Sequence, residues 1–426
     1  MFKIFQYVGE YMTKWLVVAT LMGIGGGLAA VVLKFSIDFI TQMSAMVPQW
    51  IAPAVGGILV SVLYLWDKNA AGFGTDKYIY AVNKKNSPLP FKMVFSKIAV
   101  TAITLGFQGS GGVEGPMLVI GGGLASGITK LRAWKNYFCD EDCRTLAICG
   151  AAGAIGAIFR SPLGGGIFVV EILYKSSLHY ADLFPAMLSS TMGFVIYSML
   201  ANANPMFVIP NYLPNVWNVP SFLLAGVTAG LASLLFMWIF RKVQGFFDKL
   251  PYKRMHPFIG GLLTGIILIF LPDVAATGTN VIQEMIHGVF PIKLLLLLLA
   301  GKILATSFTV TSGGSAGLVI PALFIGAISG NFISVLMGNG EFGLSASLVI
   351  AGMAASLASI ANVPIAAAIM LVEMVGLRLG VPATLGSIIG YALGHGQVIY
   401  GVTSPDHWQF EEVKQWRKSD INKKGH

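Results

Sequence analysis

The sequence predicts an all-helical integral membrane protein that is built from two repeated halves with broken and re-entrant helices. Three observations carry this prediction: an apolar composition, short interrupted apolar stretches and an internal repeat. Of the 426 residues, 55% are hydrophobic and only 11% are charged, and the mean hydropathy is +0.74. A soluble core of this size does not require so apolar a chain, so we expect lipid to be the solvent.

The apolar stretches recur along the whole chain, and many of them contain Gly or Pro or are shorter than the ~20 residues needed to cross a bilayer. They cover residues 15–36, 51–66, 92–107, 117–130, 144–174, 184–201, 221–241, 257–272, 292–311, 317–337, 343–377 and 381–400. Backbone polar groups at membrane depth are tolerated only where protein buries them or where they line a cavity. Interrupted helices in such numbers therefore predict a pathway rather than an anchor.

An internal repeat divides the chain. A constant shift of 202 positions sets Leu146–Glu171 on Leu348–Glu373, with glycines, apolar residues and a proline in common. The same shift places Ala316 opposite Glu114, and a shift of 204 pairs residues 74–76 with 278–280. We expect a first membrane half at residues 15–205 and a linker with the second half at 206–400. In transporters such halves are commonly inverted, with the substrate site where they meet, and we expect the same here.

The formal net charge is +9, and more than half of the Lys and Arg residues lie in four short runs, at residues 84–92, 130–135, 241–254 and 414–424. Because these runs separate apolar stretches, they fit membrane topology better than nucleic-acid binding. The positive-inside rule places all four runs in the cytoplasm. We therefore expect a cytoplasmic N-terminus at residues 1–14 and a short cytoplasmic tail at 401–426.

The first break in the apolar pattern, residues 109–116, carries the carboxylate of Glu114 between glycines and just before Pro116. Glycine allows the backbone to bend, and proline suits the first turn of a helix, so a helix N-terminus is predicted there. Such an N-terminus favours an anion. Glu114 could occupy the anion position itself and leave when it is protonated or displaced. The alternative is that Glu114 only caps its helix, but an ionisable group inside a membrane is costly and usually functional.

Two further breaks have a similar composition. Residues 311–321 are Gly-rich, end in Pro321 and offer the backbone amides of Leu318, Val319 and Ile320 to an anion, the alternative being a packing turn. The segment Gly72–Thr75, with Phe73 and Gly74, lies between an apolar span and a predicted helix start, and an ordinary turn explains it at least as well.

These residues resemble the CLC family of voltage-gated chloride channels and chloride–proton exchangers. Gly112–Pro116, with Val113, Glu114 and Gly115, is similar to the family's G-[K/R]-E-G-P motif, and Gly317–Pro321 to its G-x-F-x-P. Tyr400 falls where the family places a tyrosine that faces the central anion. The resemblance covers about residues 15–405. It implies a homodimer with one anion pathway in each subunit, a gate at Glu114, and a multi-pass protein of a prokaryotic plasma or inner membrane with both termini cytoplasmic.

The departures from the family pattern bear on selectivity and coupling. Phe73 stands where the family usually has a serine, and Thr75 is the nearest hydroxyl that could replace it. Val113 replaces the cation of the first motif, and Val319 replaces the phenylalanine of the second. Proton-coupled members commonly carry a second glutamate where this chain has Ile172, so tight proton coupling by that route is disfavoured.

Three functions stay open at this point. The first is a chloride pathway, either a passive channel or a weakly proton-coupled exchanger, with chloride as the transported ion and no cofactor. The second is the same scaffold selecting another anion such as fluoride, nitrate or bromide. The third is an intramembrane enzyme, but the sequence has no His-Glu-x-x-His motif, no base near Ser110 and no histidine pattern beside its three cysteines, so we expect neither catalysis nor a metal site.

Overall fold

The computed structural model describes residues 2–83, 89–130, 138–174, 179–201, 203–338, 343–397 and 399–400, and sixteen α-helices make up most of this part of the chain. The first eight helices are α1 (Phe2–Ser44), α2 (Ala52–Trp66), α3 (Thr75–Asn83), α4 (Lys92–Gly106), α5 (Glu114–Thr129), α6 (Asp140–Phe159), α7 (Gly164–Glu171) and α8 (Tyr180–Leu200). The other eight are α9 (Val219–Lys249), α10 (His256–Phe270), α11 (Thr279–His287), α12 (Ile292–Thr311), α13 (Val319–Leu336), α14 (Leu344–Ala361), α15 (Pro364–Val375) and α16 (Gly380–Gly394).

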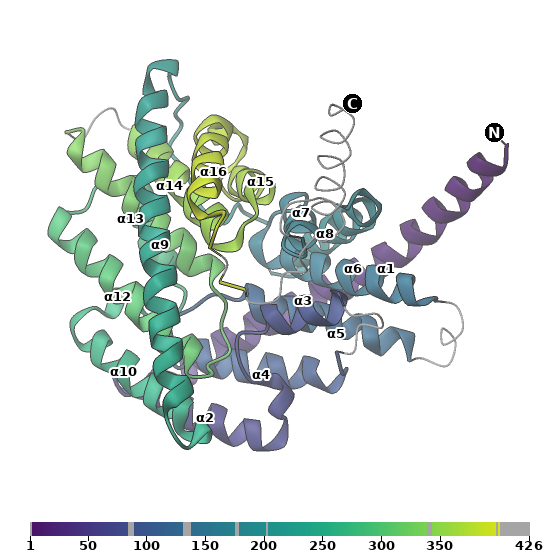
Figure 1. Cartoon of the computed structure of the whole chain (residues 1–426), viewed down its shortest axis with the longest axis horizontal. Coiled ribbons are helices and arrows are strands. Elements are labelled where there is room, and N and C mark those ends of the chain that lie inside the picture. Colours follow the sequence, from purple (N-terminus) through teal and green to yellow (C-terminus); the bar gives the residue numbers. More distant parts are fainter. Residues whose placement is uncertain are drawn as a thin grey trace, which may run out of the picture.

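The helices confirm the predicted class, because the same series of long and short elements occurs twice. In Figure 1 the first half, in purple and blue, fills the right and lower part of the molecule, and the second half, in green and yellow, fills the left and upper part. Short helices recur at equivalent places, such as α3 and α11, which have nine residues each. The interrupted apolar stretches predicted broken helices, and two of those stretches are each divided: residues 144–174 into α6 and α7, and residues 343–377 into α14 and α15.

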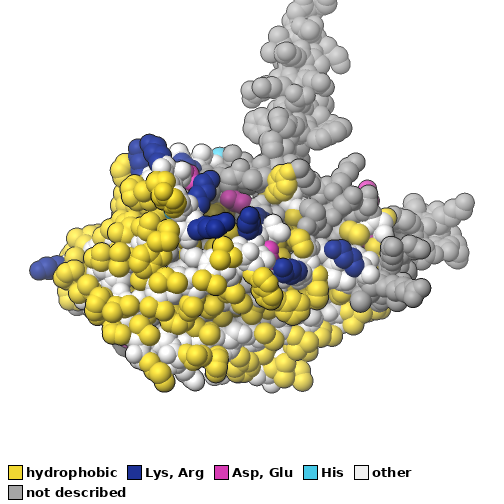
Figure 2. All heavy atoms as spheres, turned by 90° about the horizontal axis from the view of Figure 1, so that it is seen from below, with side chains coloured by type: hydrophobic (Ala, Val, Ile, Leu, Met, Phe, Trp, Pro, Cys, Tyr) yellow, Lys and Arg dark blue, Asp and Glu magenta, His cyan; other side chains and the backbone are white. Residues whose placement is uncertain are grey.

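Eight helices in the described part of the chain are long and apolar enough to cross a membrane. Their burial differs widely: 94% of the apolar span of α14 and 83% of that of α13 lie inside the protein, against 33% for α8. A helix that is hydrophobic all round and buried belongs to the centre of the molecule. The surface seen in Figure 2 is largely hydrophobic, with Lys and Arg side chains gathered towards its upper part, as a membrane protein requires.

Glycines let the central helices approach closely, in the same way in both halves. A Cβ atom added to Gly121 of α5 would lie 2.3 Å from the carbonyl oxygen of Gly150 in α6. A Cβ atom added to Gly326 of α13 would lie 2.3 Å from the carbonyl oxygen of Gly352 in α14. In lipid the hydrophobic effect does not hold helices together. Small residues at the helix contacts permit close van der Waals packing of the backbones, which stabilises the association instead.

Reciprocal hydrogen bonds show how the halves are related. The amide of Gly112 donates to the carbonyl oxygen of Gly317 at 2.8 Å, and the amide of Gly317 donates to the carbonyl oxygen of Gly112 at 2.7 Å. The hydroxyls of Thr309 and Thr104 accept hydrogen bonds, each of 3.1 Å, from the amides of Ser110 and Ser315. Contacts that are exchanged in this way define a two-fold axis between the halves, the arrangement expected of an inverted repeat.

The register of the repeat at the breaks differs from the prediction. Helix α5 begins at Glu114 and α13 begins at Val319, with a proline as the third residue of each, so the counterpart of Glu114 is Val319 and not Ala316. The shift is therefore 205 at the breaks and 202 only further along, where Arg160 and Asn362 both adopt a positive φ after α6 and α14. Both breaks are rich in Gly and Ser, so they can be aligned on identical residues in more than one register. The shift of 202 aligns them three positions away from the register of the structure.

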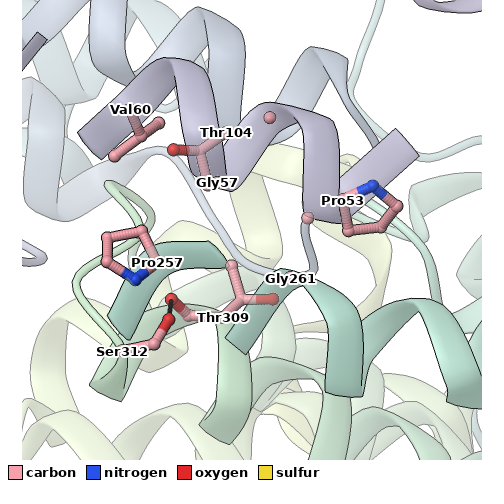
Figure 3. Close-up of a pocket in the computed structure, with 11 residues that line it drawn as sticks. Pro53, Gly57, Val60, Thr104, Pro257, Gly261, Thr309 and Ser312 are labelled. Atoms are coloured by element: carbon pink, nitrogen blue, oxygen red, sulfur yellow. Dashed lines mark hydrogen bonds between the residues drawn. The ribbon is translucent and has the colours of Figure 1, made fainter. Parts of the chain in front are cut away.

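A small cavity of about 20 Å³ lies where the halves meet and is lined by equivalent residues from each of them. Pro53 and Gly57 of α2 face it from one half, and Pro257 and Gly261 of α10 from the other, as Figure 3 shows. The paired lining places this cavity at the two-fold axis, close to the two breaks.

The predicted tail at 401–426, and the cationic residues Lys84, Lys85, Arg132 and Lys135, lie outside the described residues. The described part of the predicted N-terminal segment is helical, since α1 runs without interruption from Phe2.

Candidate functional site

The carboxylate of Glu114 defines the site. Glu114 is the first residue of α5, and its side chain is completely buried. Its Oε1 atom accepts a hydrogen bond of 2.6 Å from the backbone amide of Val319, the first residue of α13. Its Oε2 atom is buried and has no hydrogen-bond partner among the residues that the structure describes. The carboxylate therefore lies at the N-terminus of a helix in the opposite half of the protein, where the helix dipole attracts negative charge.

Two glycines make room for this carboxylate. A Cβ atom added to Gly317 would lie 2.0 Å from Oε1 of Glu114, and one added to Gly112 would lie 2.3 Å from Oε2. Leu318 and Ile320, on either side of Val319, have buried side chains. The break in the second half thus presents backbone rather than side chains to the carboxylate, as its Gly-rich sequence predicts.

The third predicted break, Gly72–Thr75, lies against the start of α5, next to Glu114. Phe73 and Gly74, with a φ of +100° at Gly74, lead into α3, whose first residue is Thr75. A Cβ atom added to Gly115 would lie 2.4 Å from the carbonyl oxygen of Phe73 and 3.0 Å from Oγ1 of Thr75. The start of α3 therefore packs directly on the start of α5. The Oγ1 atom of Thr75 is buried, and none of the described residues forms a hydrogen bond with it.

Tyr400 completes the group. Its ring centroid lies 6.1 Å from that of Phe73, with the two rings tilted by 40°. The side chain of Tyr400 is buried, and within the described part of the chain its hydroxyl has no hydrogen-bond partner. Glu114 and Asp76 interact with it electrostatically. Phe73 and Tyr400 come from opposite ends of the chain, so only the tertiary structure brings them together.

The structure thus gathers the predicted site residues at the starts of α3, α5 and α13. Val113 and Leu318 are the N-cap residues of α5 and α13, and neither makes a side-chain capping bond. The hydroxyls of Thr75 and Tyr400 are buried donors that lack an acceptor, and the N-terminus of α13 supplies the amide of Val319. A buried group of O–H and N–H donors has the chemistry that a small anion requires.

Sequence reasoning missed two buried lysines that hold the loops before α3 and α11. The Nζ atom of Lys97 donates to the carbonyl oxygen of Ala70 at 3.0 Å and also to that of Gly72, beside Phe73. The Nζ atom of Lys302 donates to the carbonyl oxygens of Val274, Ala276 and Thr277. Both side chains are completely buried. The two lysines are 205 positions apart, so the corrected register of the repeat would have revealed the pair.

Within the described ranges no group of three or more His, Cys, Asp and Glu side chains comes together to hold a metal ion, and the three cysteines form no disulfide.

Comparison with known proteins identifies the class. A family profile described as voltage gated chloride channel matches residues 62–395, and the chain belongs to this CLC family of membrane channels and transporters. An uncharacterized protein of Methanocaldococcus jannaschii is 31% identical over 403 residues, which cover 93% of this chain and 98% of that protein. A chloride/fluoride channel protein of Pseudomonas syringae is 27% identical, with 96% and 91% covered. The crystal structure of a slow cyanobacterial Cl⁻/H⁺ antiporter has the same fold, with a TM-score of 0.78, 20% identity, and 92% and 96% of the two chains covered.

Proposed function

We propose that this protein carries chloride across the cell membrane through the site at the starts of α3, α5 and α13, with Glu114 as the gate. The observation that supports this most directly is the hydrogen bond from the amide of Val319 to the Glu114 carboxylate. A helix N-terminus that binds a carboxylate also suits chloride, since both are small anions that accept N–H hydrogen bonds. The charged side chain therefore competes with the transported ion for one position.

The proposed cycle follows from this competition. While Glu114 is charged and bound to Val319, it fills the position of the anion and blocks the pathway. Protonation removes its charge, or an incoming chloride replaces it, and the side chain leaves. Chloride is then held by the amide of Val319 and by the hydroxyls of Thr75 and Tyr400, which have no acceptor of their own. On this basis the protein is a passive channel or a weakly coupled exchanger.

The setting is proposed from the family and the charge pattern. The chain is a multi-pass membrane protein, and we assign it to the plasma or inner membrane as a homodimer with one pathway in each subunit and both termini in the cytoplasm. Crosslinking of the detergent-solubilised protein would give a dimer, and reagents that label cysteines introduced near each end would react from the cytoplasmic side only.

Reconstitution tests the function. Liposomes that contain the purified protein should release chloride when a potassium ionophore balances the charge, and liposomes without it should not. Glu114→Gln, which keeps the shape and removes the charge, should raise the rate at neutral pH and abolish its dependence on pH. An absence of anion flux in both wild type and Glu114→Gln would refute the proposal.

A second candidate is the same pathway with a preference for another anion, such as fluoride, nitrate or bromide. Phe73 replaces the serine that the family pattern leads us to expect, and a relative is named as a chloride/fluoride channel protein. An aromatic ring presents its positive edge to an anion, whereas a serine presents a hydroxyl. Flux measured for each of these anions in turn would separate the candidates, since a preferred fluoride would move faster than chloride at equal gradient.

A further inference from the structure

Helix α3 carries buried polar groups that find no hydrogen-bond partner in the described ranges of the chain. The Oγ1 atom of Thr75, the Oη atom of Tyr78 and the Nδ2 atom of Asn83 are all buried without a hydrogen bond. Thr75 and Tyr78 are three residues apart and lie on one face of the helix. Buried polar groups nearly always find a partner, and where the protein supplies none the usual partner is water. We therefore expect water molecules along this face of α3.

The face begins at the site of Glu114, because Thr75 packs against Gly115. Helix α3 also packs on α6, and the hydroxyl of Tyr78 is within electrostatic range of Arg144 and Cys149 of α6, Tyr174 after α7 and Asp182 of α8. The Nη1 atom of Arg144 lies 2.6 Å from Oδ2 of Asp182, and Arg144 also donates to the hydroxyl of Tyr174. The side chain of Asp182 is only 3% exposed.

From the ion pair the polar groups reach the surface. The Nδ1 atom of His179 lies 3.3 Å from Oδ2 of Asp182, and the side chain of His179 is 57% exposed. A hollow of about 620 Å³ opens there, lined in part by Arg144, Asp182, His179 and Lys14. Thr75, Tyr78, Asp182 and His179 thus form a series from the buried site to the outside of the protein.

We propose that this series, which we call the α3 route, conducts protons by way of bound water between Glu114 and the hollow at His179. The proposal rests on the function proposed above. A proton passes along hydrogen bonds, so it can cross the closed surroundings of Tyr78, whereas chloride needs an open cavity. Asp182 also cancels the positive charge of Arg144, which leaves little attraction for an anion. At Tyr78 the hydroxyl oxygen takes a proton from water on one side and gives its own to water on the other, so the residue is unchanged.

This route makes a carboxylate at position 172 unnecessary. Ile172 has a buried apolar side chain and carries no proton. The α3 route starts from a different helix and reaches a different carboxylate, that of Asp182, so the absence of a glutamate at position 172 does not prevent proton coupling.

The experiment measures both ions in the same liposomes. A chloride gradient is imposed on vesicles that contain the protein, and chloride release and uphill proton uptake are recorded together. Wild type should move protons. Tyr78→Phe removes only the hydroxyl and should lower the number of protons moved per chloride by about tenfold or more, with chloride flux unchanged. Tyr80→Phe is the matched control, because Tyr80 is on the same helix with 44% of its surface exposed, and it should keep the wild-type ratio.

The outcomes are distinct. Chloride flux with no proton uptake in wild type overturns the α3 route and leaves the anion pathway standing, whereas no anion flux refutes the anion pathway itself. The route is also overturned if Tyr78→Phe moves as many protons per chloride as wild type, or if it loses chloride flux and proton flux in parallel. If Tyr78→Phe does not fold, two other measurements decide the question. The first is the number of protons moved per chloride in Asp182→Asn, and the second is high-resolution cryo-microscopy, which would show ordered water beside Oη of Tyr78. A wild-type number of protons per chloride in Asp182→Asn, together with no water beside Tyr78, would overturn the route.

Discussion

The carboxylate of Glu114 accepts a hydrogen bond of 2.6 Å from the amide of Val319, and these two residues are the first residues of equivalent helices, α5 and α13. The side chain at the start of one helix therefore satisfies the N-terminus of its counterpart across the two-fold axis. Val319 has no carboxylate that could accept a hydrogen bond from the N-terminus of α5, so the interaction is not reciprocated. The asymmetry leaves one carboxylate between two similar helix starts.

Gly317→Ala should displace Glu114. The added methyl group would lie 2.0 and 2.4 Å from the two carboxylate oxygens, and a glutamate side chain can move away at small cost. We expect several-fold faster anion flux at neutral pH, measured in liposomes. Gly245→Ala is the control, since a Cβ atom there meets nothing within 4 Å and wild-type flux should remain. Wild-type flux in Gly317→Ala would contradict the gate.

Wild-type flux should rise as the pH falls. Protonation makes Glu114 neutral, so the attraction between its carboxylate and the N-terminus of α13 weakens and the side chain leaves the anion position. The rate should follow the titration of a single group, measured as chloride release from liposomes buffered at a series of pH values. A rate that falls on acidification would contradict the proposed sign.

Lys97→Met and Lys302→Met form a matched pair. Each variant leaves buried carbonyl oxygens without a donor, so each should lower the stability by about 1–3 kcal/mol in thermal unfolding of the detergent-solubilised protein. Only Lys97 holds the loop that carries Phe73, so Lys97→Met should also weaken chloride binding, measured by calorimetry. Equal binding losses in the two variants would argue against a specific role for Lys97.

Glu171 and Glu373 each cap the N-terminus of a helix in the opposite half of the protein. Oε2 of Glu171 accepts a hydrogen bond of 2.7 Å from the amide of Ala366 near the start of α15, and Oε2 of Glu373 accepts one of 2.9 Å from that of Gly164 at the start of α7. Glu171→Gln and Glu373→Gln should each cost roughly 0.5–2 kcal/mol of stability, the range found for lost helix caps.

The exposed Glu284 supplies the control for these caps, because Glu284→Gln changes the same group on the surface. It should unfold at the wild-type temperature. If Glu171→Gln and Glu373→Gln also do so, the two carboxylates do not stabilise the contact between the halves.

The sequence by itself determined the membrane class, the two halves and the positions of the breaks, because hydropathy, glycine content and repeated motifs are local properties of the chain. Only the tertiary structure decided that Glu114 binds Val319 of the other half, that Tyr400 lies beside Phe73, and that Tyr78 interacts electrostatically with Asp182. These contacts join residues from about 100 to more than 300 positions apart and depend on how the halves pack about their two-fold axis. The register at the breaks was wrong for the same reason: similar glycines can be matched in several ways along a sequence, whereas the reciprocal hydrogen bonds of Gly112 and Gly317 permit only one.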